Sequence, residues 1–487
     1  MSTKNFDVCV IGAGPGGYVS AIRSAQLGLS TCVIEREYLG GVCLNVGCIP
    51  SKAMISAAHF FHRMNHDAAE MGLKLSSEVK LDMPQLQKWK TSVCERMSSG
   101  VKQLLKGNGV EIIEGEAHFS SSKELVVKSQ AEGEITILAK NFVIATGSRP
   151  IEIPGFAFDE KNVLSSTGGL ALNELPKKLV VIGGGYIGLE IAGFLAKLGS
   201  KVTVLEAAQD FLFGVADKEC VQVVIRKLKK LGVELVTQAK ANGYKKSGKA
   251  LVVEAIVAGE KKTFEGDKIL VTVGRKPNSD QMNLKKIGIQ IDEKGFVKVD
   301  AQRRTSLPGV YAIGDIACQP MLAHKASYEG VLVAEVMAGT NRAYDVKTVP
   351  AVIFTDPEIA SAGMTEEEAK QAGYADLKIA KFPLAANGRA VSLMETDGFV
   401  KMIADAKTNI ILGVHIVGVE ASNLISEAAL AIEMSARLED IALTIHPHPT
   451  LGETMMEAAE ATLGHAIHVI QRPLSKSNGR SKEATPR

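Results

Sequence analysis

The residues most suited to chemistry are two cysteines, Cys43 and Cys48, which lie five positions apart in a glycine-rich stretch. In a regular helix, residues with this spacing are separated by about 7.5 Å along the axis, whereas a disulfide needs Cα atoms about 4.4–6.8 Å apart. A disulfide here would therefore require a break in the helix, for which Asn45 and Gly47 are suited. Half of a metal site and two buried thiols are the alternatives. The sequence has no second pair of cysteines at zinc spacing, so we expect no metal.

A second group of candidate residues lies near the C-terminus, where His446 and His448 alternate with prolines. Thr450 and Glu453 have the spacing of a capping box, which predicts that Thr450 is the N-cap of the helix that follows. A lone histidine is most often structural, and the His-Pro-His pattern is also compatible with a weak metal site. The capping role of Glu453 does not exclude a second role.

The cysteine pair directly follows a pattern of strand, glycine turn, helix and strand over residues 7–35, with the helix expected to run to residue 28. Three glycines of this turn have separate roles: a tight turn, close approach of a pyrophosphate, and close contact of helix and strand. They are, in that order, Gly12, Gly14 and Gly17. The second strand ends at Glu35, which is placed to accept hydrogen bonds from a ribose diol.

The same pattern returns over residues 179–206, with glycines at the corresponding positions and Glu206 at the corresponding distance from the first of them. Two such motifs predict two dinucleotide sites, although tight turns in an unliganded α/β sheet are the simpler alternative. A carboxylate at Glu206 favours a free 2′-hydroxyl, and no arginine follows it, so the second site should prefer NAD to NADP. The glycines are Gly183, Gly185 and Gly188.

Two further apolar strands, over residues 141–147 and 268–274, end at Gly147 and Gly274, and each is followed by a turn with arginine and proline. A third such strand, over 310–313, precedes Gly314 and Asp315. The simplest topology inserts one Rossmann-like domain into the other. We therefore expect an α/β protein with a first dinucleotide domain over 1–150 and 276–346, a second over 151–275, a C-terminal α+β domain over 347–472 and a disordered tail over 473–487.

Composition narrows the possible functions. The chain has 487 residues, a net charge of +2, 46% hydrophobic residues and seven cysteines. The balanced charge is unlike that of a nucleic-acid-binding protein, and the sparse cysteines are unlike those of a disulfide-stapled secreted domain. No stretch approaches the roughly 18 apolar residues of a membrane span, and no targeting segment is recognisable. We expect no membrane or nucleic-acid partner, and either a cytoplasmic location in a prokaryote or a mature organellar protein.

Residues 6 to about 470 resemble the flavin-dependent disulfide oxidoreductases. The resemblance rests on the paired glycine motifs, the segment from Cys43 to Lys52, and short motifs at 145–147, 274–278, 314–315, 323–326 and 355–358. It implies FAD at the first site, NAD at the second, and a homodimer formed by the C-terminal domain. Within the family the chain is most similar to members that oxidise a dihydrolipoyl group carried by an acyltransferase lipoyl domain or by the glycine cleavage H protein.

The resemblance also assigns roles to residues. Cys43 and Cys48 form the redox-active pair, His448 is the acid/base that Glu453 orients, and both act opposite the cysteines of the other subunit. Lys52 pairs with Glu190 beside the flavin. The FAD contacts it implies, beyond the first glycine turn and Glu35, are Gly41, Lys52, Ala117, Gly147, Asp315 and Ala323. Gly274 joins the second turn and Glu206 at the NAD site.

Three other functions stay open. A glutathione- or trypanothione-type reductase has a similar architecture, but Glu206 opposes its use of NADPH. Mercuric reductase is disfavoured because the C-terminal segment has no paired cysteines. A flavin-binding interaction protein without turnover is opposed by the complete set of Cys43, Cys48 and His448. Val42 and Gly452 depart from the residues usual in the family, threonine and serine, without removing a reacting group.

Overall fold

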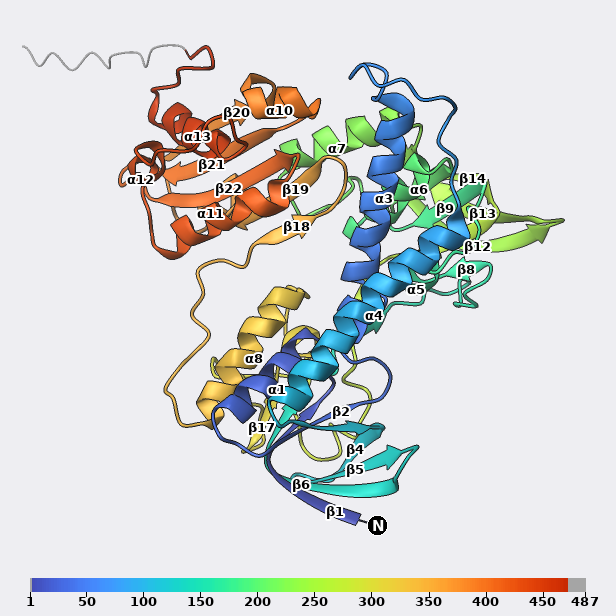
Figure 1. Ribbon diagram of the computed structural model, residues 1–487, viewed down its shortest axis with the longest axis vertical. Coiled ribbons are helices and arrows are strands. Elements are labelled where there is room, and N and C mark those ends of the chain that lie inside the picture. The colour runs from blue at the N-terminus through green and yellow to red at the C-terminus, as the bar shows by residue number, and fades with distance from the viewer. Residues whose placement is uncertain (1, 472–487) are drawn as a thin grey trace, which may run out of the picture. The chain divides into compact units, whose positions relative to one another are not determined.

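The computed structural model describes residues 2–471, and within them five β-sheets and their flanking helices (Figure 1). The chain divides into two compact units, residues 1–213 with 228–345 and residues 214–227 with 346–487. The tail predicted over 473–487 lies outside the described residues. The domain boundaries expected from the sequence remain a prediction.

The first unit is built around a seven-stranded sheet of order β3-β2-β1-β6-β5-β4, in which β17 pairs with β6. The strands β3, β2, β1, β6 and β17 run parallel, and β4, β5 and β6 form an antiparallel meander. Because β17 lies far downstream of β6, the chain returns to this sheet after an intervening domain, as the insertion topology requires. The strands are β1 (Ser2–Ile11), β2 (Thr31–Glu35), β3 (Glu111–Glu114), β4 (Glu116–Ser121), β5 (Glu124–Ser129), β6 (Gly133–Ile144) and β17 (Val310–Ala312).

Side chains of β1 alternate between two apolar cores, because successive residues of a strand point to opposite faces. Val8 and Val10 join a core that includes residues of α1, α4 and α8, and Figure 1 shows α1 beside α8. Cys9 and Ile11 join the core on the other face. The helices of this unit are α1 (Pro15–Gln26), α2 (Gly41–Asn45), α3 (Cys48–His66), α4 (Met83–Gly107), α5 (Ser166–Leu170), α6 (Tyr186–Lys197), η1 (Gly314–Ile316) and α8 (Ala323–Met337).

The intervening domain has a parallel five-stranded sheet of order β11-β10-β9-β15-β8 and a three-stranded antiparallel sheet β12-β13-β14, and a short ribbon of β7 and β16 lies where the chain enters and leaves it. Each glycine turn joins a strand to the helix that follows it, β1 to α1 and β9 to α6. The strands are β7 (Ser148–Pro150), β8 (Val163–Leu164), β9 (Lys178–Ile182), β10 (Lys201–Leu205), β11 (Glu234–Val236), β12 (Ala239–Ser247), β13 (Ala250–Val257), β14 (Glu260–Gly266), β15 (Lys268–Val271) and β16 (Arg275–Pro277).

The second unit contains an antiparallel sheet of order β18-β19-β22-β21-β20. Its apolar core joins this sheet to α11, α12 and α13. The strands are β18 (Ala351–Ile353), β19 (Glu358–Gly363), β20 (Leu377–Pro383), β21 (Phe399–Asp405) and β22 (Ile411–Gly418). The helices are α9 (Glu366–Gln371), η2 (Leu384–Ala386), α10 (Gly388–Leu393), α11 (Ala421–Glu433), α12 (Leu438–Ala442) and α13 (Glu453–Leu463), and α7 (Lys218–Lys230) begins in this unit.

Three sequence expectations need correction. The first strand begins at Ser2 rather than at residue 7, and the first helix ends at Gln26 rather than at Gly28. Contrary to the expectation for membrane spans, one helical stretch among the described residues, Gly41–His66, is long and apolar enough to cross a bilayer. This is weak evidence for a span, because core helices of globular proteins meet the same criterion.

Candidate active site

The first glycine turn has the geometry that its sequence predicts. A Cβ atom at Gly12, whose φ is +96°, would lie 2.5 Å from the Ala145 carbonyl oxygen, and one at Gly17 would lie 1.8 Å from the Gly12 carbonyl oxygen. Both positions therefore exclude any larger residue. The N-cap Gly14 faces open space, with no atom within 4 Å of an added Cβ. No side chain therefore stands at the N-terminus of α1, where a pyrophosphate would approach.

The second turn repeats this geometry. A Cβ atom at Gly183 would lie 2.6 Å from the Thr272 carbonyl oxygen, and one at Gly188 would lie 2.1 Å from the Gly183 carbonyl oxygen. The N-cap Gly185 again faces open space at the start of α6. Both turns therefore have the shape of dinucleotide sites.

The acidic residue at the end of each second strand is hydrogen-bonded to its own glycine turn. Oε2 of Glu35 accepts from the backbone N–H of Ala13 at 2.7 Å, and Oε2 of Glu206 accepts from that of Gly184 at 2.6 Å. A carboxylate has about four acceptor positions. Glu35 also accepts from the backbone N–H groups of Glu37 and Tyr38, and Glu206 from that of Ala208. About one acceptor position at Glu35 and two at Glu206 are left for a ribose diol, and that role stays a prediction.

The residues around the first turn fit a bound flavin nucleotide. The hydroxyl of Thr146, just past the end of β6, is buried and has no hydrogen-bond partner among the described residues, which is unusual for a buried polar atom. Gly41 approaches the turn so closely that an added Cβ would lie 2.6 Å from the Cα atom of Gly14. Gly147, which follows Thr146, faces open space with a φ of +67°. These features agree with a ligand that lies along the carboxyl ends of the strands.

The remaining predicted flavin contacts lie in the same unit. Asp315 is half-buried in η1, and its Oδ2 accepts a hydrogen bond of 2.6 Å from the hydroxyl of Ser148. Ala117 lies in β4, and Ala323 is the first residue of α8. Gly274, predicted at the second site, follows β15 with a φ of +124°. No contact of Ala117 or Ala323 defines a role for either residue.

The cysteine pair straddles a break between two helices. Cys43 lies in α2 and Cys48 is the first residue of α3, and Val46 and Gly47 between the helices leave helical geometry. Gly47 therefore interrupts the helix as predicted, whereas the Asn45 side chain donates to the carbonyls of Leu39 and Gly41 and stabilises the end of α2. Both cysteines are present as thiols, Cys43 half-buried and Cys48 exposed.

The two thiols have different acidities. A hydrogen bond from Cys43, reinforced by the positive charge of Lys52, lowers the pKa of Cys48 to about 7. The same hydrogen bond, together with burial, raises the pKa of Cys43. Cys48 is therefore the sulfur that ionises first and is partly a thiolate near neutral pH, whereas Cys43 stays a thiol. A thiolate is the reactive form of cysteine.

Lys52 and Glu190 form the predicted ion pair, with Nζ 3.0 Å from Oε2. Lys52 lies one turn into α3, after Cys48, and the buried Glu190 lies in α6, the helix of the second turn. The pair thus links the cysteine helix to the predicted NAD turn. Tyr186, at the start of α6, is a further residue near this pair that the sequence did not indicate. Burial raises its pKa, and the charges that act on it include Glu190 and Cys48.

Ser148 and Arg275 were also missed as site residues. Nε of Arg275 donates to the Ser148 hydroxyl at 2.8 Å, and that hydroxyl in turn donates to Asp315. The repeated turns with arginine and proline, after Gly147 and Gly274, were the sequence signal that could have identified this contact.

In the second unit, Nδ1 of His448 and Oε1 of Glu453 are 2.8 Å apart, as expected for an oriented histidine. Burial raises the pKa of Glu453, but hydrogen bonds from Thr450 and His448 hold it below its usual value overall. The neighbouring His446 bonds instead to Glu427, at 3.0 Å.

The predicted capping box is only half formed. The backbone N–H of Thr450 donates to Glu453, but the Thr450 hydroxyl donates to the carbonyl of Pro447. The N-cap is Gly452 rather than Thr450, because α13 begins at Glu453. The threonine hydroxyl therefore does not cap the helix.

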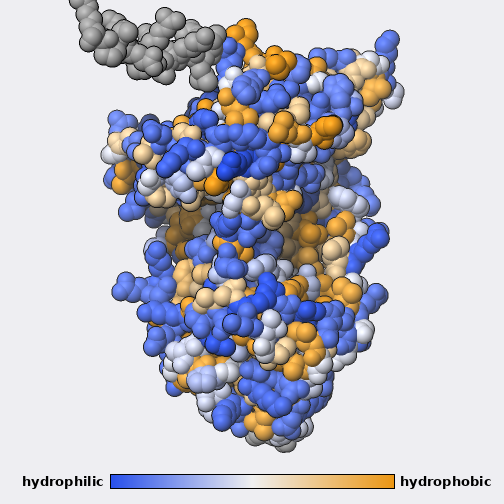
Figure 2. All heavy atoms as spheres, turned by 90° about the vertical axis from the view of Figure 1, so that its left-hand side faces the viewer, coloured by the Kyte–Doolittle hydropathy of each residue, from blue (hydrophilic) through white to orange (hydrophobic). Residues whose placement is uncertain are grey.

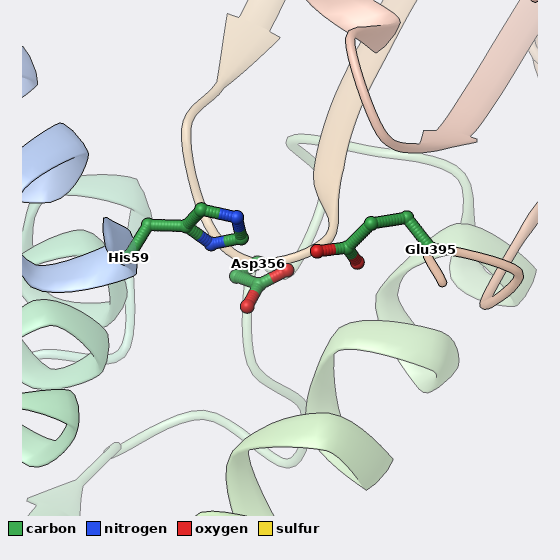
Figure 3. A group of neighbouring side chains, drawn as sticks. All are labelled: His59, Asp356 and Glu395. Carbon is green, nitrogen blue, oxygen red and sulfur yellow. The ribbon is translucent and has the colours of Figure 1, made fainter. Parts of the chain in front are cut away.

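One further group of possible ligands is drawn in Figure 3, which shows His59 on α3, and Asp356 and Glu395 in the second unit. We assign no metal site to them, because the histidine belongs to the first unit and the carboxylates to the second. Within the second unit, Asp356 and Glu395 both help to raise the pKa of Lys227, against the effect of its burial.

Comparison with known proteins agrees with this geometry. Residues 6–330 match the family model described as pyridine nucleotide-disulphide oxidoreductase, and residues 349–459 match the dimerisation domain of that family. The dihydrolipoyl dehydrogenase of Geobacillus stearothermophilus is 50% identical over 466 residues, covering 96% of this chain and 98% of the relative. That of Thermus scotoductus is 46% identical over 472 residues, covering 96% of this chain and 100% of the relative.

Solved structures show the same fold. LpdA from Mycobacterium tuberculosis superimposes with a TM-score of 0.86 at 26% identity, covering 95% of this chain and 99% of that chain. The Cu(II) complex of the HOCl-induced flavoprotein disulfide reductase RclA from Escherichia coli gives 0.84 at 27% identity, covering 94% and 99%.

The match to the dimerisation domain supports a homodimer. Large apolar side chains of the second unit, including Leu443 and Ile445, are 82% and 94% exposed. Figure 2 shows apolar residues reaching the surface among polar ones on the face that it displays. Together with the two nucleotide turns and the thiol pair, these findings place the chain in the pyridine nucleotide-disulphide oxidoreductase family, as a flavoprotein oxidoreductase that uses FAD and NAD.

Proposed function

We propose that the protein is a cytoplasmic dihydrolipoyl dehydrogenase, which oxidises a protein-bound dihydrolipoyl group and reduces NAD. The observation that carries this proposal is the unequal thiol pair, in which Cys48 has a pKa of about 7 and Cys43 a raised one. The likeness to dihydrolipoyl dehydrogenases over nearly the full chain supports the choice of substrate.

We propose that the first unit holds both cofactors. The turn at Gly12, Gly14 and Gly17, with Glu35, Gly41, Lys52, Ala117, Gly147, Asp315 and Ala323, would hold FAD, in a domain formed by residues 1–150 and 276–346. The turn at Gly183, Gly185 and Gly188, with Glu206 and Gly274, would hold NAD, in a domain over 151–275. Residues 347–472 would form the subunit interface. When bound, FAD supplies a two-electron carrier between the dithiol and NAD.

The reaction starts from the oxidised enzyme, in which Cys43 and Cys48 share a disulfide. His448 of a second copy takes the proton from one substrate thiol, because only the thiolate attacks a disulfide sulfur. The substrate thiolate attacks Cys43, a substrate–Cys43 bond forms, and the Cys43–Cys48 bond breaks. Cys48 leaves as the thiolate, because the thiol with the lower pKa is the better leaving group.

The second half of the exchange releases the product. The other substrate thiol attacks its neighbouring sulfur, the lipoyl disulfide closes, and Cys43 leaves. The proton held by His448 passes to Cys43, whose raised pKa favours the thiol, and His448 takes the proton of the second substrate thiol. The substrate has then lost two electrons and two protons, and the enzyme holds a thiol at Cys43, a thiolate at Cys48 and a protonated His448. Glu453 acts as a positioning residue, because its hydrogen bond to Nδ1 leaves Nε2 of His448 to exchange the proton.

The test is dihydrolipoamide-dependent NAD reduction by FAD-loaded protein. Cys43→Ser and Cys48→Ser should each abolish turnover while FAD stays bound, because each removes one sulfur of the exchanging pair. Cys94→Ser, which changes a buried cysteine of α4, is the matched control and should retain turnover. Full activity in either active-pair variant would exclude the dithiol from the mechanism.

The substrate and partner have their own tests. Reduction of glutathione disulfide or trypanothione disulfide with NADPH, at rates above the dihydrolipoamide reaction, would instead favour the disulfide reductase alternative. FAD binding without any turnover would favour a non-catalytic flavoprotein. Reconstitution with lipoyl domains of different acyltransferases and with the glycine cleavage H protein should identify the carrier served.

A further inference from the structure

The two-stranded ribbon of β7 and β16 brings together residues that are far apart in the sequence. Arg275 pairs with Pro150 and Pro277 with Ser148 in antiparallel register. Nη2 of Arg275 donates to the Ser148 carbonyl at 2.7 Å, and its Nε donates to the Ser148 hydroxyl at 2.8 Å. One guanidinium therefore holds both the backbone and the side chain of a serine that is only 4% exposed.

These contacts fix the direction of the serine hydroxyl. A guanidinium has donors but no acceptor, so the Ser148 oxygen must accept from Arg275 and its single proton must point elsewhere. That proton goes to Oδ2 of Asp315, at 2.6 Å. These hydrogen bonds run from a cation through a hydroxyl to a carboxylate, an order in which each hydrogen bond strengthens the next.

Asp315 is held from a second direction through its backbone. The N–H of the preceding Gly314 donates to Oε2 of Glu329 at 2.6 Å. Glu329 is fully buried on α8, and its other oxygen lies 3.1 Å from Nζ of Lys325 and 3.0 Å from Nη2 of Arg303. With the backbone of this turn fixed, rotation of its side chain is the main freedom left to Asp315, and Ser148 restricts it.

The held orientation leaves one acceptor of Asp315 available. Among the described residues, Oδ1 of Asp315 accepts no hydrogen bond from a protein donor, whereas Oδ2 is occupied by Ser148. An alcohol donor of a ligand would meet an oriented carboxylate oxygen rather than a rotating one. Pre-ordering of this kind improves affinity by reducing the entropy lost on binding.

We propose that Ser148 is a positioning residue at the FAD site. Ser148 orients the Asp315 carboxylate, and Arg275 holds Ser148 in the orientation that this requires. The inference rests on the proposed contact of Asp315 with the flavin nucleotide. Ser148 itself need not touch FAD; it acts through Asp315, and Arg275 acts through Ser148.

The test is FAD binding to the full-length apoprotein, measured by titration of flavin fluorescence. Ser148→Ala should raise the Kd for FAD about tenfold, the factor equivalent to 1.4 kcal/mol. Ser148→Thr, which keeps the hydroxyl, should restore most of the affinity. Ser200→Ala is the matched control, because Ser200 is also buried and donates to a carbonyl, that of Pro176, at 2.7 Å. This variant should bind FAD as the unmodified chain does.

A double-mutant cycle tests the route of the effect. If Ser148 acts through Asp315, Ser148→Ala should cost little further affinity in a chain that already carries Asp315→Ala. Should Asp315→Ala bind too little FAD to titrate, Asp315→Asn gives the same comparison with a smaller coupling, because a neutral amide accepts a weaker hydrogen bond. Additive losses would overturn the inference.

The outcomes separate this inference from the proposed function. Unchanged FAD affinity in Asp315→Ala would refute the proposed flavin contact of Asp315. A large loss in Asp315→Ala with none in Ser148→Ala would refute the positioning role alone. Neither result depends on turnover of dihydrolipoamide.

Discussion

The acidity of Cys48 should depend on one hydrogen bond, which can be removed or kept by a choice of residue at position 43. Cys43→Ala removes the donor, whereas Cys43→Ser keeps a hydroxyl that can donate to the thiolate. A hydrogen bond to a charged group contributes about 1.5–3 kcal/mol, or about one to two pH units at 1.36 kcal/mol per unit. Cys48 is exposed, so water weakens the contact and the lower end applies.

We therefore expect the pKa of Cys48 in Cys43→Ala to rise by about one unit relative to Cys43→Ser. The assay is the rate of alkylation by iodoacetamide between pH 5 and 10, with mass spectrometry to follow Cys48. Because only the thiolate reacts, the rate rises with pH through the pKa. At pH values well below both pKa values, Cys43→Ala should react roughly ten times more slowly than Cys43→Ser, and near pH 7 roughly five times more slowly.

Equal pH profiles in the two variants would refute this account of the hydrogen bond. Lys52→Met in the Cys43→Ser background then tests the second cause, the positive charge beside Cys48. If neither change moves the profile, the local structure has no measurable control over the acidity of Cys48.

Three further predictions concern buried or paired charges. Glu190→Gln should lower the free energy of unfolding by about 1–3 kcal/mol in urea titrations, because it removes the buried negative charge that pairs with Lys52. Glu206→Ala should reduce the preference for NAD over NADP, measured as a ratio of kcat/KM values, because the repulsion of a 2′-phosphate is lost. Lys401→Met should lower the free energy of unfolding by about 3–5 kcal/mol near pH 7, because it removes the ammonium that lies 2.8 Å from the buried Asp217 carboxylate. Burial raises the pKa of Asp217 but Lys401 outweighs it, so the pKa is lowered and this stabilisation should disappear as pH falls below about 4.

The glycine turns were predictable because the spacing of their glycines is characteristic. The close contact of Gly17 with Gly12 lies within the turn and follows from that spacing, whereas the contact of Gly12 with Ala145 depends on a strand far along the chain. The prediction that Thr450 is the N-cap was wrong. The N–H of Thr450 can donate to Glu453 whether the helix begins near Thr450 or at Glu453, so this sequence pattern does not determine where the helix begins.

The contact of Ser148, Arg275 and Asp315 could not be predicted in the same way. It depends on the pairing of two short strands at opposite ends of the inserted domain. No periodic pattern in the sequence marks a serine or an arginine after a glycine as part of a site. The different acidities of the two thiols likewise require positions in space, because they depend on which sulfur donates and on which lies near a lysine from the next turn of α3.

Glu35 and Glu206 each brace the backbone of the loop that they are expected to serve. The carboxylate that a sugar would engage is already part of the scaffold, so arrival of a nucleotide adds a partner without rebuilding the loop.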